Sequence, residues 1–448
     1  MTFTYKNLLS KLSYLFLVLI ILLPQGVGYR PYYKALSIDG PRTFILLTII
    51  IASILFIKNI LHKSLKPLNR SYFYFILFSA LTLISAFNSE NISSSLFLSI
   101  KLLTIWVVFA CSFDYINHQT SNDQYFLNCL FIILSGLLVY CIIEFFLQTH
   151  AIPSWTRTSF SNFDDYSLVN NRIITRNGLI LTQGPFTWNH GFGGVICCLL
   201  GVTLYTLEKY KVLGIILTTL FFLAVLTNGM RAVFIAITFG LLIWMVYRFN
   251  IKKIIVLFIC MLLASGVYAT KANPKNILFY DTDINIQSEY HLNSLKALFV
   301  NQEKKFNVER TSNFLTQFLP YSSEEIGDYV VSKGTLGIRF NGLIENLLNY
   351  ESWWLTGYGV GSFQKPDIIK SSAYQYNDPG LIMLLLFELG LLPFLVIMYL
   401  VIKSFFISMK NRDWMLGIGI SSWFVFSLSS MEIWPMLIIT MFITKIFR

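Results

Sequence analysis

The chain has 448 residues, of which 55% are hydrophobic and only 13% are charged, and its net charge is +11. Its mean hydropathy is +0.62, which implies more apolar surface than a soluble domain can bury, so the composition excludes a soluble globular protein. In lipid each segment must satisfy its own backbone hydrogen bonds, and the apolar runs are about 20 residues long, so we expect membrane-spanning helices and not a closed barrel.

The apolar runs define the fold class. Each is close to the length that crosses about 30 Å of hydrocarbon at 1.5 Å per residue, which predicts an all-α polytopic membrane protein with about 12 transmembrane helices. The predicted spans lie near residues 12–29, 42–58, 71–88, 94–113, 125–148, 187–206, 211–227, 231–247, 254–270, 379–403, 414–430 and 432–446. The first run follows Lys6 and Lys11 as a signal peptide would, but it lacks a small-residue cleavage site, so we expect it to remain a membrane helix.

Two polar segments interrupt the spans. The predicted parts are the helices of residues 1–148, the loop 149–186, the helices of 187–270, the loop 271–378 and the helices of 379–448. The longer loop contains many aromatic residues, and its apolar residues have helical spacing near 308–318 and 337–350. We therefore expect a large helical loop that caps the membrane and not a disordered segment.

Basic residues indicate the orientation, because Lys and Arg accumulate in short cytoplasmic loops. With a cytoplasmic N-terminus, the cytoplasmic segments hold Lys6, Lys11, Lys58, Lys63, Lys66, Arg70, Lys209, Lys211, Arg248, Lys252, Lys253, Lys403, Lys410, Arg412, Lys445 and Arg448. The short connections on the other side hold little beyond Arg30, Lys34 and Arg42. This bias predicts that both termini are cytoplasmic and both long loops lie outside. It also accounts for the positive charge without a nucleic-acid partner.

The cysteines and histidines give no sign of a metal or disulfide framework. All six cysteines lie in predicted spans, and the five histidines are scattered with no pair at i,i+4. The sequence has no P-loop, dinucleotide fingerprint or nucleophile elbow. We therefore expect no metal and no cofactor, and the free energy for any reaction must come from the substrate or from a gradient.

Charged residues and short motifs gather at the predicted outer ends of the helices. In chain order these are Arg176 followed by Gly184-Pro185-Phe186-Thr187-Trp188-Asn189-His190, then Leu226-Thr227-Asn228-Gly229-Met230-Arg231, then Arg339 followed by Leu355-Thr356-Gly357-Tyr358-Gly359, and finally Asp378 followed by Phe387-Glu388-Leu389-Gly390. Ionisable residues near membrane depth are costly and are therefore functional candidates. The alternative for each arginine is that it reaches to lipid headgroups.

The order and spacing of these motifs resemble the O-antigen ligase and O-antigen polymerase superfamily over roughly residues 170–410, while the first five spans match only in kind. The resemblance implies a GT-C-like, metal-independent glycosyltransferase in the bacterial inner membrane. Its expected donor is an oligosaccharide on undecaprenyl diphosphate, used at the periplasmic face. Membrane lipid is an expected partner, and a chain-length regulator protein is a candidate partner.

One position separates the two kinds of enzyme in this family. Ligases typically carry His-Asn at the start of the helix that ends in Glu-Leu-Gly, whereas this sequence has Asp378-Pro379-Gly380 there, which looks more like a polymerase. A polymerase would transfer the growing glycan onto a new lipid-linked repeat unit. A ligase that transfers the glycan to lipid A-core remains an alternative. A transporter or flippase for lipid-linked oligosaccharide is a further alternative, against which stands the lack of a repeat between the two halves.

The resemblance and the chemistry of the donor assign roles to the charged residues. Arg231 and Arg339, together with Arg176, would hold the diphosphate, because guanidinium groups bind phosphate oxygens in a bidentate manner and stabilise the charge of the leaving group. Asp378 would orient or deprotonate the acceptor hydroxyl. The alternative for Asp378 is an N-cap in front of a proline at the first helical position.

Three further residues complete the candidate set. His190 and Lys101 are assigned to substrate binding, although His190 also fits a packing role at the interface. Lys101 and Glu144 are ionisable residues inside predicted spans and are candidates for a polar network that lines a lipid cavity.

Overall fold

The computed structural model describes residues 14–15, 18, 21–22, 70–89, 92–103, 110, 123–148, 175–176, 179–186, 189–272, 355, 357, 359, 385–386, 388–411, 413–428 and 434–447. The helices are α4 (Arg70–Ala86), α5 (Ile92–Leu103), α7 (Asp123–Leu147), α9 (Asn189–Lys209), α10 (Lys211–Asn228), α11 (Arg231–Tyr247), α12 (Ile251–Lys271), α19 (Leu391–Lys410), α20 (Trp414–Ser427) and α21 (Trp434–Ile446). The two strands are β1 (Thr175–Arg176) and β2 (Leu179–Ile180).

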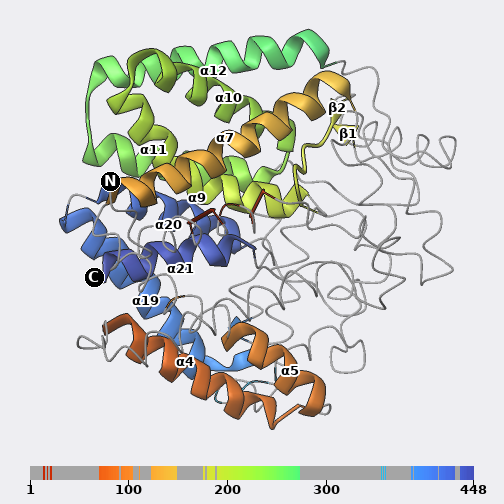
Figure 1. Ribbon diagram of the computed structural model, residues 1–448, viewed down its shortest axis with the longest axis vertical. Helices are drawn as coiled ribbons and strands as arrows, with labels where there is room; N and C mark the ends of the chain where they lie inside the picture. Colours follow the sequence, from red (N-terminus) through yellow and green to blue (C-terminus); the bar gives the residue numbers. More distant parts are fainter. Residues whose placement is uncertain are drawn as a thin grey trace, which may run out of the picture.

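The described part of the chain is mostly helical (Figure 1). Five of its helices, α7, α9, α10, α12 and α19, are long and apolar enough to cross a membrane, and four shorter apolar helices accompany them. This confirms the prediction of a helical chain with several helices able to span a bilayer. The predicted span 42–58 and the predicted helical segments 308–318 and 337–350 lie outside the described residues.

Helix α9 lies at the centre of a bundle that also contains α7, α10, α11, α12, α20 and α21, which we call the larger bundle. It contacts α7, α10, α11, α20 and α21, and 89% of the residues in its most apolar stretch are buried, against 17% in α12. Its sequence, rich in glycine, cysteine and threonine, explains the position, because helices in lipid associate through small residues that let backbones approach closely. Helix α12 contacts α10 and leaves most of its apolar residues exposed, as expected for a helix at a lipid-facing edge.

The contact between α9 and α20 depends on two glycines. A Cβ atom on Gly201 would overlap the carbonyl oxygen of Met415, and a Cβ atom on Gly419 would overlap the carbonyl oxygen of Cys198. The two backbones therefore touch directly, which no larger residue at either position would allow.

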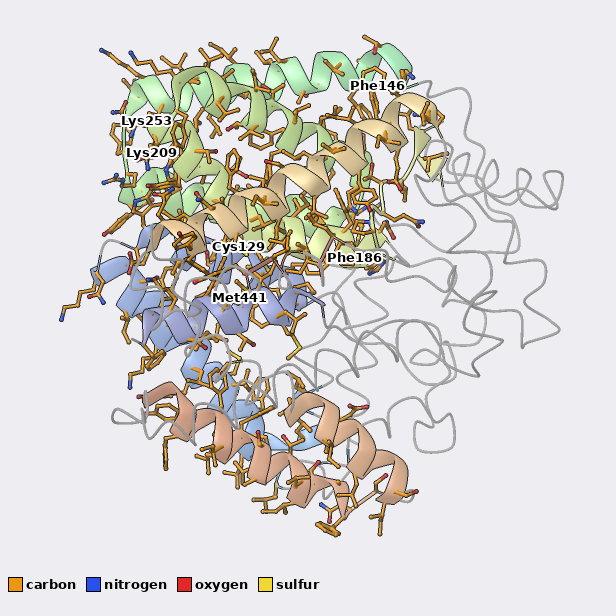
Figure 2. The ribbon with its side chains drawn as sticks, viewed as in Figure 1. Cys129, Phe146, Phe186, Lys209, Lys253 and Met441 are labelled. Atoms are coloured by element: carbon orange, nitrogen blue, oxygen red, sulfur yellow. The ribbon has the colours of Figure 1, made fainter. Side chains whose placement is uncertain are left out.

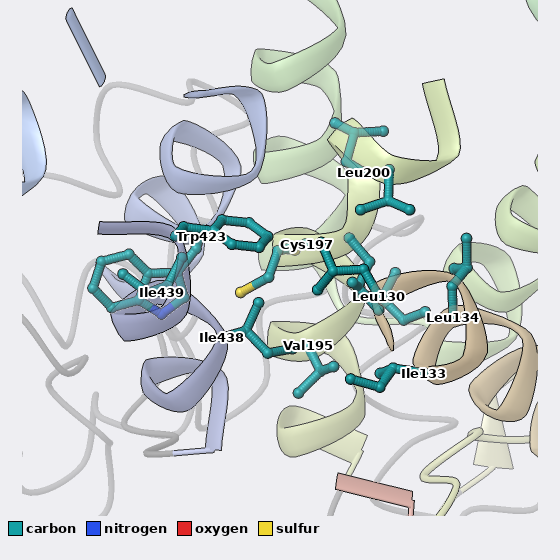
Figure 3. Close-up of a cluster of buried hydrophobic side chains, with 14 of the residues drawn as sticks. Leu130, Ile133, Leu134, Val195, Cys197, Leu200, Trp423, Ile438 and Ile439 are labelled. Carbon is teal, nitrogen blue, oxygen red and sulfur yellow. The ribbon is translucent and has the colours of Figure 1, made fainter. Parts of the chain in front are cut away.

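Apolar side chains from four helices fill the space around this contact. Figure 3 shows Leu130, Ile133 and Leu134 of α7 on one side of Val195, Cys197 and Leu200 of α9, with Trp423 of α20 and Ile438 and Ile439 of α21 on the other. Each of these side chains is buried. A second layer joins this core through α19, which contacts α20, α21 and α4, while α5 contacts α4 (Figure 1).

The predicted span 379–403 is wrong as a single helix. The chain breaks at Gly390, whose φ of 86° and ψ of 175° are accessible almost only to glycine. Helix α19 begins after this residue, at Leu391, and continues to Lys410. The Glu-Leu-Gly motif ends a helical stretch, as predicted, because residues 385–386 and 388–389 are helical and the Gly390 nitrogen donates to the Leu386 carbonyl oxygen at 2.9 Å. The error lies in joining this stretch to α19, which begins after the break.

The predicted loop 149–186 contains regular structure, so the chain is not entirely α-helical. Strands β1 and β2 form an antiparallel pair in which Thr175 lies opposite Ile180 and Arg176 lies opposite Leu179. The residues between the strands in the sequence are Asn177-Gly178, a pair strongly favoured in two-residue hairpin turns.

Candidate functional site

The larger bundle has two chemically different ends. At the end that we call the basic end, Glu208 accepts hydrogen bonds from Arg248 (3.0 Å) and from the indole nitrogen of Trp244 (3.2 Å), and Lys253 lies 3.2 Å from its carboxylate. Figure 2 shows Lys209 and Lys253 at this end, whereas Phe146 and Phe186 lie toward the opposite end. Basic residues predicted to be cytoplasmic, from the connection between α9 and α10 and from the connection between α11 and α12, therefore lie at one end of the fold.

The opposite end, which we call the loop end, joins the first two sequence motifs. The backbone nitrogen of Thr182 donates to the carbonyl oxygen of Thr227 at 3.1 Å. The side-chain nitrogen of Asn228 donates to the carbonyl oxygens of Thr182 (3.2 Å) and Asn189 (2.7 Å). Asn228 is buried, so it ties residues 179–186, the start of α9 and the end of α10 into one unit.

Glu144, in the last turn of α7, holds the same segment from the other side. One of its carboxylate oxygens accepts hydrogen bonds from the backbone nitrogens of Gln183 (3.0 Å) and Gly184 (3.2 Å). The side chain is 1% exposed, and a buried carboxylate is stable only when such donors compensate it. Gly184 has a φ of 58°, which lets the chain turn toward the carboxylate at little steric cost.

Arg231 is the exposed first residue of α11 at this end. It follows Gly229, which ends α10 with a φ of 68°, and Met230, whose side chain makes no capping hydrogen bond to α11. Asn228 contacts the start of α9, and a Cβ atom on Gly193 of α9 would lie 2.6 Å from the Val233 side chain of α11, so the first turns of α9 and α11 are neighbours near Arg231. Helix N-termini carry partial positive charge, so two of them beside an exposed arginine make a favourable place for an anion.

Two further motifs, those that contain Gly359 and Glu388, contact each other. The backbone nitrogen of Gly359 donates to the carbonyl oxygen of Glu388 at 2.9 Å. The end of α4 supports this contact, because the Ser85 hydroxyl donates to the same Glu388 oxygen (3.0 Å) and the Asn88 side chain donates to the Gly357 carbonyl (3.4 Å). The end of helix α4, in the first quarter of the chain, therefore supports a contact between two motifs that both lie in the second half of the sequence.

The structure places some of the predicted site residues and not others. His190, half-buried, and Arg231 lie at the loop end, and the backbone of Arg176 lies in the β1–β2 pair that leads into the same loop. The backbone of Lys101 lies in α5, which contacts α4 in the other layer (Figure 1). Arg339, Asp378 and the side chains of Arg176 and Lys101 lie outside the described residues, so their roles remain predictions.

The sequence carries little signal for three of the residues that join these motifs. Asn228 is one of three residues that separate Thr227 from Arg231 in its motif, and Ser85 and Asn88 lie in a predicted span with only general similarity to the family. The polar run Asn88-Ser89-Glu90-Asn91 between two apolar runs was the available signal for a turn near a site. Glu144 stood out as ionisable inside a span, but no pattern indicated its backbone partners.

Comparisons with models of known protein families and with characterised proteins found no match. Among the described residues, no three His, Cys, Asp or Glu side chains are grouped so that they could hold a metal ion.

Asn228→Ala is expected to destabilise the loop end. The substitution leaves the buried carbonyl groups of Thr182 and Asn189 without their side-chain donor, at a cost of about 2 kcal/mol of unfolding free energy. Unfolding in detergent, followed by tryptophan fluorescence, measures the effect. A matched control is Asn250→Ala, because Asn250 caps α12 from an exposed position at the basic end and its loss costs about 1 kcal/mol. Equal unfolding midpoints for Asn228→Ala and the wild type would contradict the structural role of Asn228.

Proposed function

We propose that this protein is an O-antigen polymerase, a GT-C-like glycosyltransferase with about 12 spans. It transfers the growing glycan from undecaprenyl diphosphate onto a new lipid-linked repeat unit. The observation that carries the proposal is the contact between the Gly-Pro-Phe-x-x-Asn motif of residues 184–189 and the Leu-Thr-x-x-x-Arg motif of residues 226–231. Asn228 joins them, and Arg231 is exposed beside the junction.

The proposed orientation follows from the basic end. Positively charged connections stay in the cytoplasm, and Glu208 is the acidic partner of Arg248 and Lys253 there. The loop end then faces the periplasm of a bacterial inner membrane, with both termini cytoplasmic. Lipid-linked repeat units present their diphosphate at that membrane surface, which is where Arg231 would meet it.

The proposed chemistry needs a group that binds the diphosphate before the reaction and stabilises it as it leaves. Arg231 supplies two parallel N–H donors, and the first turns of α9 and α11 add partial positive charge. Arg339 and Arg176 also bind the diphosphate, and His190 and Lys101 contact the lipid-linked glycan. Asp378 serves the acceptor hydroxyl as a base or as an orienting group. No nucleotide is required, because cleavage of the glycosyl–diphosphate bond supplies the free energy.

Purified protein incubated with lipid-linked repeat units tests the proposal. The expected result is a ladder of longer glycans that still carry one lipid diphosphate, separated by gel electrophoresis. A product that forms only after lipid A-core is added would instead identify a ligase. Movement of the lipid-linked unit across proteoliposomes without any longer glycan would identify a transporter.

A further inference from the structure

We infer that Glu144 is a positioning residue for the proposed diphosphate site: it fixes residues 181–186 against the α10–α11 turn and so sets where Arg231 stands. This inference rests on the proposed function, because it names Arg231 as the residue that meets the diphosphate. Glu144 itself is 1% exposed and acts through the backbone, so it is not a catalytic residue.

The Glu144 carboxylate attaches the loop to α7. The carboxylate oxygen accepts hydrogen bonds from two successive backbone nitrogens, those of Gln183 and Gly184. Two donors on one charged oxygen restrict the loop more than a single contact would. Hydrogen bonds to a charged acceptor are also roughly twice as strong as neutral ones.

The loop is in turn connected to the turn that carries Arg231. Thr182, the residue before Gln183, uses both backbone groups on the end of α10: its nitrogen donates to Thr227 and its oxygen accepts from Asn228. Only Gly229 and Met230 separate Asn228 from Arg231. A displacement of the loop is therefore expected to shift the turn that begins α11.

The end of α7 that carries Glu144 is itself held in place. Lys271, at the end of α12, donates to the carbonyl oxygen of Phe146 at 2.7 Å, and its amine lies 5.1 Å from the centre of the Phe146 ring. Gln148 donates to the Phe145 carbonyl (2.6 Å) and accepts from the backbone nitrogen of Ile180 (3.3 Å). The residues that directly follow Glu144 are thus held by α12 and by β2 (Figure 2 labels Phe146), so the end of α7 that carries the carboxylate is anchored to its neighbours.

Three substitutions of Glu144 separate the effect of its negative charge from the effect of its side-chain length. Glu144→Gln keeps the length and one acceptor oxygen but loses the charge, whereas Glu144→Asp keeps the charge on a shorter side chain and Glu144→Ala removes both. The matched control is Glu208→Gln. Glu208 is the largely buried acid at the basic end of the same bundle, with 10% of its side chain exposed, and it contacts no residue of the loop end.

Two measurements test the inference on the full-length protein in detergent. The first is hydrogen–deuterium exchange of the peptide that covers residues 181–186. We expect exchange to be about tenfold faster in Glu144→Gln than in the wild type, as weaker neutral bonds imply, and faster still in Glu144→Ala.

The second measurement is glycan elongation. KM for the lipid-linked unit should rise about tenfold in Glu144→Gln, and kcat should change less than about threefold. Glu144→Asp should recover part of the loss. Glu208→Gln should match the wild type in both measurements.

Each outcome decides a different point. Unchanged exchange in both Glu144→Gln and Glu144→Ala would show that Glu144 does not hold the loop. Faster exchange with an unchanged KM would show that the loop does not position the site. If Glu144→Ala fails to insert, Glu144→Gln and Glu144→Asp still carry the test. A wild-type protein that lengthens no glycan overturns the proposed function, whereas an active wild type with unchanged KM in Glu144→Gln overturns this inference alone.

Discussion

Arg231→Ala is expected to abolish long glycan while the protein still inserts in the membrane. Arg231 is exposed at the start of α11, so its removal opens no cavity in the core. The loss is in the stabilisation of the diphosphate, and we expect the rate to fall on the order of a hundredfold to a thousandfold, as for other groups that stabilise developing charge. Arg231→Lys should recover little, because an ammonium group lacks the planar pair of donors. Initial rates of elongation with lipid-linked repeat units measure both variants.

The same helix offers a matched control for this prediction. Arg248 caps the opposite end of α11 and pairs with Glu208 at 3.0 Å. Arg248→Ala removes the same kind of side chain from the basic end and is expected to keep normal elongation. Full activity of Arg231→Ala at normal expression would refute the proposal that Arg231 binds the diphosphate. If Arg231→Ala and Arg248→Ala lose activity equally, the effect is on the helix and not on the site.

Helix boundaries followed from the sequence wherever the thickness of the bilayer was the only constraint. The predicted span 231–247 coincides with α11, and the predicted span 211–227 ends one residue before α10 does. The bilayer core requires a fixed length of apolar chain, so a run of apolar residues indicates where a helix lies. The break at Gly390 did not follow, because the apolar run continues through it and hydropathy carries no information about φ.

The site was predictable in its residue types and less so in its contacts. The sequence predicts the Gly-Pro-Phe and Leu-Thr-x-x-x-Arg motifs at the outer ends of helices, and the structure brings both to the loop end. What joins them is Asn228 and the buried carboxylate of Glu144, and both bind backbone groups. Every residue has a backbone nitrogen and oxygen, so residue identities alone do not reveal which ones a side chain selects. Ser85 and Asn88 escaped notice for the same reason.

Asp378→Asn is expected to lower turnover on the order of a hundredfold or more, because asparagine cannot accept the proton of the acceptor hydroxyl. Asp378 lies outside the described residues, and the prediction follows from its place before Pro379 in the sequence. The competing role is an N-cap, which asparagine fills as well as aspartate does, at a cost of at most about 1 kcal/mol. A protein that depends only on the cap therefore keeps its activity in Asp378→Asn.

Four variants resolve the two roles of Asp378 in the elongation assay. Asp378→Glu keeps a carboxylate and should retain part of the activity, whereas Asp378→Ala loses cap and carboxylate together. Asp413 stands at the N-cap position of α20, where its side chain makes no capping hydrogen bond. Asp413→Asn therefore controls for the change from acid to amide alone and should leave elongation unchanged. An inactive Asp378→Asn beside a partly active Asp378→Glu supports a chemical role. Full activity of Asp378→Asn reduces Asp378 to a cap, and the half-buried His190 at the loop end then becomes the next base to test.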